Sequence, residues 1–266
     1  MRFLVAIPAY NEERYLPGVL AAVRRHASDI LVIDDGSTDT TPALLRREPG
    51  VHVITHRENR GYGLSLIDAF QFADRRGYDW VITLDCDEQH EPAHIPDFLD
   101  AVARDDADVI SGSRYLRSFP DDDRPPPERR HINQLVNDML GQVLGLPLTD
   151  SFCGFKAYRI AAMRRLALDE PGYAFPLQFW VQCVRAGLRI RELPVRRIYR
   201  DKSRTFGGTL DDPAARLVHY LAVFVRELQR EPVRPFTKRA RSLCRVQQPD
   251  PCVTRNSLPR ASISAS

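Results

Sequence analysis

Short apolar runs alternate with longer segments of mixed polarity through the first half of the chain. Each run has the length and the valine and isoleucine content of a β-strand, and the segments between the runs are typical of helices. The runs that predict strands are residues 3–7, 30–33, 51–55, 78–84 and 107–111. Strands that alternate with helices form βαβ units around a parallel sheet. The fold class predicted here is therefore α/β, with a mainly parallel central sheet flanked by helices.

The pattern changes in the second half of the chain. Residues 119–128 contain three consecutive aspartates and three consecutive prolines, which a helix or a central strand does not accommodate. This segment is predicted to be an exposed loop and a candidate for a mobile lid. The further predictions are helices over 129–144, 174–186 and 213–229, and strands within 149–158 and over 188–199. Residues 231–266 lack an apolar period, so we predict one domain over 1–230 followed by a disordered basic tail.

Polar residues directly follow three of the predicted strands. The first strand runs into residues 8–13 (PAYNEE), the second into Asp34 and Asp35, and the fourth into Asp85 and Asp87. Open α/β sheets bind their ligands beyond the carboxyl ends of their strands, and parallel strands end at the same edge. The coincidence of three such strand ends predicts a binding site at that edge.

Asp85, Asp87 and Gln89 form a candidate metal site. The two carboxylates are one residue apart and can turn toward one point as the chain leaves the sheet, while Gln89 adds a neutral amide oxygen. Such oxygen ligands suit Mg²⁺ or Mn²⁺ with positions left open for substrate phosphates. The alternative interpretation is an acidic turn that only faces solvent.

Composition narrows the class of protein. Apolar residues make up 43% and charged residues 27% of the 266 residues, as in a soluble globular protein. A net charge of +3 gives no reason to predict nucleic-acid binding. The five cysteines have no C-x-x-C spacing, which favours reduced thiols over a disulfide framework or a zinc site. No apolar run approaches the roughly 18 residues of a membrane span. We therefore predict a cytoplasmic protein without a transmembrane segment, with at most peripheral contact at the inner membrane face.

Five motifs stand in order along the chain and together carry a resemblance. They are residues 7–12 (IPAYNE), 34–39 (DDGSTD), 59–61 (NRG), 85–90 (DCDEQH) and 112–115 (GSRY). Over about residues 3–210 the chain resembles the family 2 glycosyltransferases of GT-A fold, especially the branch of dolichyl-phosphate and polyprenyl-phosphate mannosyltransferases. The resemblance implies a metal-dependent, inverting transfer of a hexose from a GDP-sugar or a UDP-sugar. It leaves the acceptor open between a polyprenyl phosphate and a small molecule with a free hydroxyl group.

The resemblance also implies roles for single residues. Asp87 would be the direct metal ligand, and Asp85 and Gln89 would complete the site for Mg²⁺ or Mn²⁺. The residues expected to bind the nucleotide-sugar are Pro8, Tyr10, Glu12, Asp35, Asp85, Asp87, Arg200 and Arg204. Those expected to bind the acceptor are Arg114, Arg129 and Asn133. Other interpretations stay open, because Asp35 can cap a helix, Glu12 can interact with a helix dipole and Arg129 can face solvent.

The group that activates the nucleophile is a separate question. Gln178 stands where the branch carries a glutamate, and an amide cannot act as a base. A phosphate acceptor is anionic near neutral pH and needs no base, whereas a hydroxyl acceptor needs one. Asp150 is the candidate base, although it can equally bind local backbone groups. The predicted catalytic residues are Asp87, Asp150 and Arg114.

Two rival functions are compatible with part of the pattern. A sugar nucleotidyltransferase also combines a nucleotide, a metal and carboxylates on an α/β sheet, but residues 8–12 lack the glycine-rich basic loop expected there. A non-catalytic nucleotide-sugar-binding protein could lie on a membrane surface through the amphipathic helix 213–229, whose polar residues include Arg216 and Arg226. Packing of this helix on its own domain is the alternative.

Overall fold

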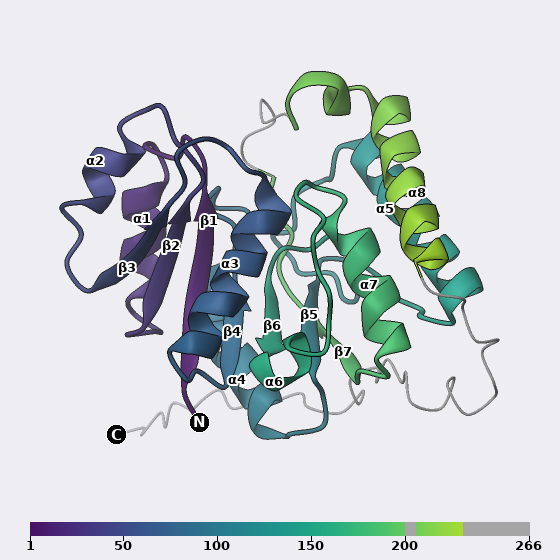
Figure 1. Ribbon diagram of the computed structural model, residues 1–266, viewed down its shortest axis with the longest axis horizontal. Helices are drawn as coiled ribbons and strands as arrows, with labels where there is room; N and C mark the ends of the chain where they lie inside the picture. Colours follow the sequence, from purple (N-terminus) through teal and green to yellow (C-terminus); the bar gives the residue numbers. More distant parts are fainter. Residues whose placement is uncertain (200–205, 231–266) are drawn as a thin grey trace, which may run out of the picture.

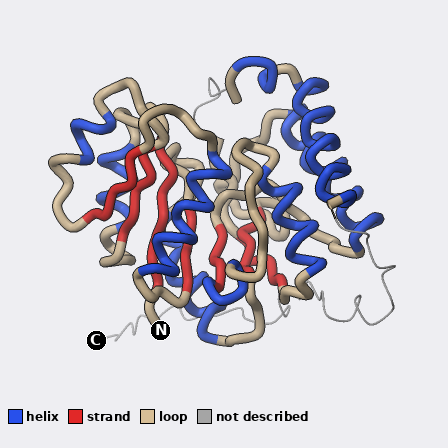
Figure 2. Tube along the Cα trace, in the orientation of Figure 1, coloured by secondary structure: helices blue, strands red, loops and turns tan. Residues whose placement is uncertain are grey.

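The computed structural model describes residues 1–199 and 206–230. Its centre is a seven-stranded sheet with the strand order β3-β2-β1-β4-β6-β5-β7, and helices cover both faces (Figure 1, Figure 2). The strands are β1 (Phe3–Ala9), β2 (Ile30–Asp34), β3 (Val51–Thr55), β4 (Trp80–Thr83), β5 (Val109–Ser113), β6 (Lys156–Arg159) and β7 (Ile190–Pro194). Residues 200–205 and 231–266, which include the tail predicted to be disordered, lie outside the described residues.

Most neighbouring strands are parallel. β1 pairs in parallel with β2 and β4, β2 with β3, and β5 with β7. β6 runs antiparallel between β4 and β5, with Lys156 opposite Thr83 of β4. The predicted α/β fold with a mainly parallel sheet is confirmed, and the strand predicted within 149–158 corresponds to β6. Because β6 runs in the opposite direction, the turn before it lies at the edge where β1, β2 and β4 end.

Side chains of the strands enter two cores, one on each face of the sheet. Leu4 and Leu31 belong to the core shared with α3, α5, α7 and α8, whereas Val5 and Val32 belong to the core shared with α1 and α4. The helices are α1 (Leu16–Val23), α2 (Thr41–Leu45), α3 (Tyr62–Arg75), α4 (Ile95–Ala103), α5 (Pro127–Leu144), α6 (Ile160–Met163), α7 (Phe175–Arg185) and α8 (Pro213–Gln229), with short 3₁₀ helices η1 (Pro92–His94) and η2 (Gly208–Asp211). Successive residues of a strand point to opposite faces, so one strand supplies both cores.

The strand predicted over 188–199 is too long. β7 ends at Pro194: Val195 N still donates to Ser113 O of β5, but the amides of Arg197 and Tyr199 bind side chains of the 119–126 loop instead of a neighbouring strand. Asp122 Oδ1 accepts a hydrogen bond from Arg197 N at 2.8 Å, and Asp123 Oδ2 accepts from Tyr199 N at 2.9 Å. Residues 119–126 form a loop as predicted, but α5 already begins at Pro127. Movement of this loop as a lid stays a prediction.

The last described helix, α8, spans the residues predicted for it. Asp212 caps its first turn by accepting a hydrogen bond from Ala215 N at 2.7 Å. The helix packs against α7 and α5 at one end of the sheet (Figure 1). Its packed face contains Arg216, Tyr220, Val223, Phe224 and Glu227. Among the helices that the structure describes, none has the length and apolar content to cross a membrane.

Candidate functional site

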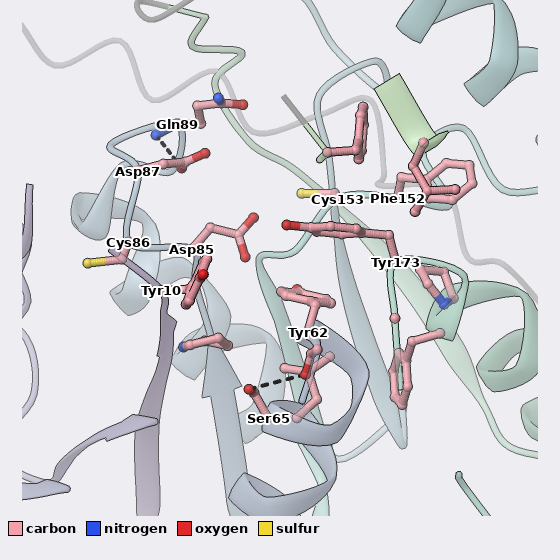
Figure 3. A pocket seen from close by; sticks show the side chains of 18 of the residues that line it. Tyr10, Tyr62, Ser65, Asp85, Cys86, Asp87, Gln89, Phe152, Cys153 and Tyr173 are labelled. Carbon is pink, nitrogen blue, oxygen red and sulfur yellow. Dashed lines mark hydrogen bonds between the residues drawn. The ribbon is translucent and has the colours of Figure 1, made fainter. Parts of the chain in front are cut away.

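A pocket of about 660 Å³ opens at the carboxyl ends of β1, β2 and β4. Residues from all five sequence motifs line it, together with residues of α3, α5, α7 and α8. Figure 3 shows Asp85, Asp87 and Gln89 on one side of the pocket and Phe152 on the opposite side, with the Tyr173 ring reaching from that side toward Asp85. The volume is in the range of small-molecule sites. The fold therefore brings motifs that are far apart in the chain to one cavity.

The first motif is fixed against the second by Asn11. This residue has a left-handed backbone (φ 55°), and its Oδ1 accepts hydrogen bonds from Thr38 N at 2.8 Å and Asp39 N at 3.3 Å. Tyr10 lines the pocket and is 44% exposed, so its ring is accessible to a ligand. Glu12 also lines the pocket, and it precedes α1, so its interpretation as a first-turn carboxylate is wrong.

Asp35 connects the second motif to the third. Its Oδ1 lies 2.6 Å from His56 Nδ1 and accepts a hydrogen bond from Arg60 N at 2.8 Å, while its Oδ2 accepts from Gly61 N at 2.8 Å. Asp35 is buried and lines the pocket, and its carboxylate binds this loop rather than capping a helix. Gly61 has a φ of 101°, and a Cβ there would lie 2.4 Å from Pro171 O. Only glycine fits at this position without strain.

His56 is a site residue that the sequence did not indicate. Its ring is buried and bridges two carboxylates, with Nδ1 at 2.6 Å from Asp35 and Nε2 at 2.8 Å from Asp68. The ring therefore holds the Asp35 carboxylate in place at the pocket wall. A single histidine in a polar loop has no periodic pattern, so its partners are visible only in the fold.

Asp85 and Asp87 enter the pocket from the loop that follows β4. The Asp85 carboxylate packs on the backbone of Gly154, where a Cβ would lie 2.4 Å from Asp85 Oδ2. Asp87 Oδ1 accepts a hydrogen bond from Gln89 N at 3.1 Å, which closes the loop on itself. Both carboxylates point into the same open space (Figure 3). Glycine at 154 is what allows the first carboxylate to lie flat against the turn before β6.

His90 supports this loop from behind. It is buried, and its Nδ1 accepts a hydrogen bond from Asp85 N at 3.0 Å. Burial lowers the pKa of His90 to about 4, so the ring is neutral at physiological pH and its Nδ1 can act as an acceptor. His90 therefore binds the backbone and fixes where the Asp85 side chain begins.

The acidic loop fits a divalent ion. Asp85, Asp87 and Gln89 line the same pocket and offer two carboxylates and one amide oxygen. Residues 1–199 and 206–230 contain no group of three histidine, cysteine or acidic side chains that could hold a metal ion. Mg²⁺ in enzymes of phosphate substrates uses one or two carboxylates and completes its shell with phosphate oxygens and water. The donor set is thus the type that needs a substrate diphosphate to complete it.

Arg114 and Asp150 form a bidentate ion pair behind the pocket. Arg114 Nε donates to Asp150 Oδ2 at 2.7 Å and Nη2 donates to Oδ1 at 3.0 Å, and Asn133 Nδ2 donates to Oδ1 at 2.7 Å. Burial by itself would raise the pKa of Asp150, but the charge and hydrogen bonds of Arg114 bring it below its ordinary value. The prediction of Asp150 as a base does not fit this geometry, because both oxygens are engaged, the proton affinity is low and the side chain is fully buried. Asp150 instead orients Arg114, which lines the pocket.

Glu192 of β7 holds the turn that carries Asp150. Its Oε1 accepts hydrogen bonds from Thr149 N at 3.0 Å and from Asp150 N at 3.1 Å, and its Oε2 accepts from the Thr149 hydroxyl at 3.0 Å. Burial raises the pKa of Glu192 to about 7. Glu192 therefore fixes the backbone of the turn, and the Asp150 side chain on that turn binds Arg114.

The predicted acceptor residues lie together. Arg114, Arg129 and Asn133 line the pocket, the last two from neighbouring turns of α5. Asn133 is buried, and its Oδ1 has no hydrogen-bond partner among the described residues. The two other cations predicted for the diphosphate, Arg200 and Arg204, lie outside the described residues.

Gln178 is not a pocket residue. It is fully buried, its Oε1 accepts hydrogen bonds from Asp169 N and Glu170 N at 2.8 Å, and its Nε2 donates to Glu227 Oε2 at 2.9 Å. A glutamate at this position would place a second carboxylate against Glu227 of α8. The departure from the branch is thus explained by helix packing rather than by chemistry in the pocket.

The sequence missed the aromatic wall of the pocket. That wall includes the rings of Phe152, Tyr173, Phe206 and Tyr220, and Leu210 and Arg216 line the same pocket. Arg216 was assigned to a polar face of the last helix, but α8 turns it inward together with Tyr220. The signal was available, because Arg216, Tyr220, Val223 and Glu227 follow one another at helical spacing on the packed face.

Comparisons with known proteins identify the family of this chain. The profile of glycosyl transferase family 2 matches residues 4–167. The undecaprenyl-phosphate mannosyltransferase of Micrococcus luteus is 32% identical over 231 residues, which cover 83% of this chain and 94% of the relative. The polyprenol monophosphomannose synthase of Mycolicibacterium smegmatis is 33% identical over 209 residues, which cover 73% of this chain and 76% of the relative.

A solved structure has the same fold. Glucosyl-3-phosphoglycerate synthase from Mycobacterium tuberculosis, crystallised with Mn²⁺, UDP and phosphoglyceric acid, superimposes with a TM-score of 0.66 at 16% identity. The match covers 87% of this chain and 80% of that chain and identifies the GT-A fold. This chain is therefore a glycosyltransferase that belongs to glycosyl transferase family 2, and it is similar within that family to the polyprenyl-phosphate sugar transferases.

Proposed function

We propose that the protein transfers a hexose, with inversion and with the help of Mg²⁺ or Mn²⁺, from a GDP-sugar or a UDP-sugar to a polyprenyl phosphate. The observation that carries this proposal is one pocket with an acidic loop on one side, arginines beside it and an aromatic wall opposite. The acidic loop suits a metal-bound diphosphate, the arginines suit the phosphate of the acceptor, and the aromatic wall suits the apolar chain of the acceptor.

The donor is assigned to the side of the pocket formed by the strand ends. Tyr10 offers a ring for the nucleobase, and Glu12 and Asp35 offer carboxylates for base or ribose donors. Asp85, Asp87 and Gln89 would hold the divalent ion, which supplies positive charge to the leaving diphosphate when bound. The related synthase that binds Mn²⁺ together with UDP supports this assignment.

The acceptor is assigned to the side that carries the arginines. An oxygen of the acceptor phosphate would form a bond to the anomeric carbon of the sugar while the bond from that carbon to the donor diphosphate breaks. The phosphate oxygen is already anionic, so this step needs no general base. Arg114 occupies the carboxylate of Asp150, which agrees with a nucleophile that needs no base. The names of the relatives from M. luteus and M. smegmatis also support a polyprenyl phosphate acceptor.

The site of action follows from the acceptor. We place the protein at the inner face of a membrane in peripheral contact, with residues 1–230 as the catalytic domain. Three apolar side chains of α8, Val218, Leu221 and Val225, are exposed and available for such contact. Membership of family 2 argues against the nucleotidyltransferase and the non-catalytic binder as rivals.

The test is a transfer assay with the purified full chain. GDP-mannose, UDP-glucose and UDP-N-acetylglucosamine are offered with undecaprenyl phosphate or undecaprenol in detergent micelles, and lipid products are identified by mass spectrometry. We expect one donor to give a glycosylated lipid phosphate, loss of product with EDTA and recovery with Mn²⁺ or Mg²⁺. Equal transfer to undecaprenol would contradict the phosphate acceptor, and full activity in EDTA would contradict the metal.

A further inference from the structure

Arg216 is a buried cation with an unused donor. Its side chain comes from α8, and the residue is only 3% exposed. Nη1 donates a hydrogen bond to Leu210 O at 2.8 Å, whereas Nη2 is buried without a hydrogen-bond partner among the described residues. A buried charged group whose N–H donor has no hydrogen-bond acceptor costs free energy, and native proteins rarely contain one. Arg216 lines the pocket, so a ligand in the pocket can supply the missing acceptor.

The acidic residues near Arg216 are occupied elsewhere. Asp211 Oδ1 accepts hydrogen bonds from Phe206 N at 2.7 Å and Gly207 N at 3.0 Å, and Asp212 caps α8. Burial raises the pKa of Tyr220, one helical turn further along, to about 12, so its hydroxyl stays neutral. No carboxylate within residues 1–199 and 206–230 forms an ion pair with Arg216 in the structure. Its positive charge therefore remains available to the pocket.

A second arginine shares the same neighbourhood. The guanidinium carbon of Arg216 lies 4.2 Å from the centroid of the Phe206 ring, and that of Arg129 lies 4.9 Å from the same centroid. The two side chains reach this ring from different helices, α8 and α5. A phosphate group can accept hydrogen bonds from two guanidinium groups at once, because each offers a planar fork of donors.

The surroundings of the two arginines are aromatic. Phe206 packs edge-on against Tyr173 with centroids 5.3 Å apart, and Tyr220 stacks on Phe152 at 5.0 Å. All four rings line the pocket. A free anion such as inorganic phosphate would gain little from these rings, whereas a phosphate monoester of an apolar chain would use both the charges and the rings.

We propose that Arg216 binds the phosphate of the acceptor together with Arg129, with the first part of the acceptor's apolar chain against Phe152, Tyr173 and Tyr220. This assignment rests on the proposed function and adds to it a binding residue from α8, beyond the matched residues 4–167. The donor diphosphate is the other possible phosphate. The acceptor is favoured because Phe152, which stacks on Tyr220, lies across the pocket from Asp85 and Asp87 (Figure 3).

The experiment compares wild type with Arg216→Gln, Arg216→Lys and a control, Arg226→Gln. Arg226 lies on the same helix, its side chain is 53% exposed, and it does not line the pocket. Calorimetry measures the Kd of farnesyl phosphate, of farnesol, and of GDP and UDP with Mn²⁺, and melting temperatures are recorded for each variant. Removal of a charged hydrogen bond should weaken farnesyl phosphate binding in Arg216→Gln at least about tenfold. Arg216→Lys should lie between, because lysine keeps the charge without the fork.

The comparison of ligands within one variant separates binding from folding. We expect farnesol and nucleotide affinities to stay within about twofold in Arg216→Gln, and all affinities to stay unchanged in Arg226→Gln. Equal losses for farnesyl phosphate and farnesol would mean a collapsed pocket wall and would overturn the role of the charge. Loss of nucleotide binding alone would assign Arg216 to the nucleotide-sugar and would also overturn its proposed role at the acceptor phosphate. If wild type binds nucleotide but not farnesyl phosphate, the proposed acceptor class fails as well.

Discussion

The two sides of the pocket are built in different ways. The proposed donor side, formed by Tyr10, Glu12, Asp35, Asp85 and Asp87, is held mainly by hydrogen bonds between acidic or amide side chains and nearby backbone N–H groups, with the His56 ring against Asp35. The proposed acceptor side, formed by Arg114, Arg129, Asn133, Phe206, Arg216 and Tyr220, is held by buried ion pairs and by arginines packed on rings. The difference suggests that the first side is specified by local motifs and the second by helix packing.

The largest expected effect falls on the donor side. Asp87→Asn should lower kcat/KM by about 10³-fold, because the proposed divalent ion, which would neutralise the leaving diphosphate, loses its predicted direct ligand. The melting temperature without ligand should change little, since the Oδ1 of an asparagine can accept the hydrogen bond from Gln89 N that Asp87 Oδ1 accepts. Mn²⁺ with GDP or UDP should raise the melting temperature of wild type and not of the variant.

Asp97→Asn is the matched control for this substitution. Asp97 is an exposed aspartate of α4 that contacts His94 and does not line the pocket. Its substitution should leave both activity and the ligand-induced shift in melting temperature intact. An Asp87→Asn variant that keeps the Mn²⁺-dependent shift would contradict the predicted metal site.

Much of this side could be predicted from the sequence. Glycines, aspartates and asparagines at strand ends report local backbone geometry, so motifs such as residues 34–39 and 85–90 could be read directly. Arg216 and His56 could not be assigned in this way. Their roles depend on which distant side chains they meet, Phe206 in one case and Asp35 with Asp68 in the other.

The second prediction tests the junction of the two sides. Asp150→Asn should lower kcat about 10²-fold and destabilise the fold by about 3–5 kcal/mol, because Arg114 is left as a buried charge with only a neutral partner in place of its carboxylate. The shape of the pH–rate profile decides between positioning and base catalysis. If Asp150 only positions Arg114, the variant should show a pH–rate profile of the same shape at a lower rate. If Asp150 is a general base, its substitution should remove the acidic limb of the profile.

The control for Asp150→Asn is Asp108→Asn. Asp108 also forms a paired salt bridge, with Arg189 at 3.0 Å, but far from the pocket lining. This variant should lose some stability and keep its activity. A fall in activity of similar size in both variants would mean that the loss follows stability and not the orientation of Arg114.

The third prediction concerns the helix contact behind the acceptor side. Gln178→Glu should destabilise the protein by about 2–3 kcal/mol. The substitution removes the Nε2 donor that binds Glu227, and it places a second carboxylate against that buried side chain. The double variant Gln178→Glu with Glu227→Gln restores one donor and one acceptor and should recover part of the loss. Urea denaturation of the single and double variants measures the coupling free energy. A coupling near zero would mean that the two side chains do not depend on each other.

The smallest expected effect is the pH dependence of stability that Glu192 brings to the acceptor side. Its pKa is raised from 4.5 to about 7 in the fold, so between these values the native state binds more protons than the unfolded state. The contribution of Glu192 to the free energy of unfolding should therefore fall as pH rises from about 5 to 7, by at most about 1.4 kcal/mol per pH unit, and level off above it. His90, whose pKa is lowered from 6.5 to about 4, contributes a rise below pH 6.5, so the difference between wild type and Glu192→Gln isolates the contribution of Glu192. Glu192→Gln cannot titrate and should lack this fall, whereas Glu48→Gln, at a surface pair with Arg24, should keep it. Urea denaturation at several pH values measures the difference, and a parallel profile in wild type and Glu192→Gln would mean that Glu192 titrates as it does in the unfolded chain.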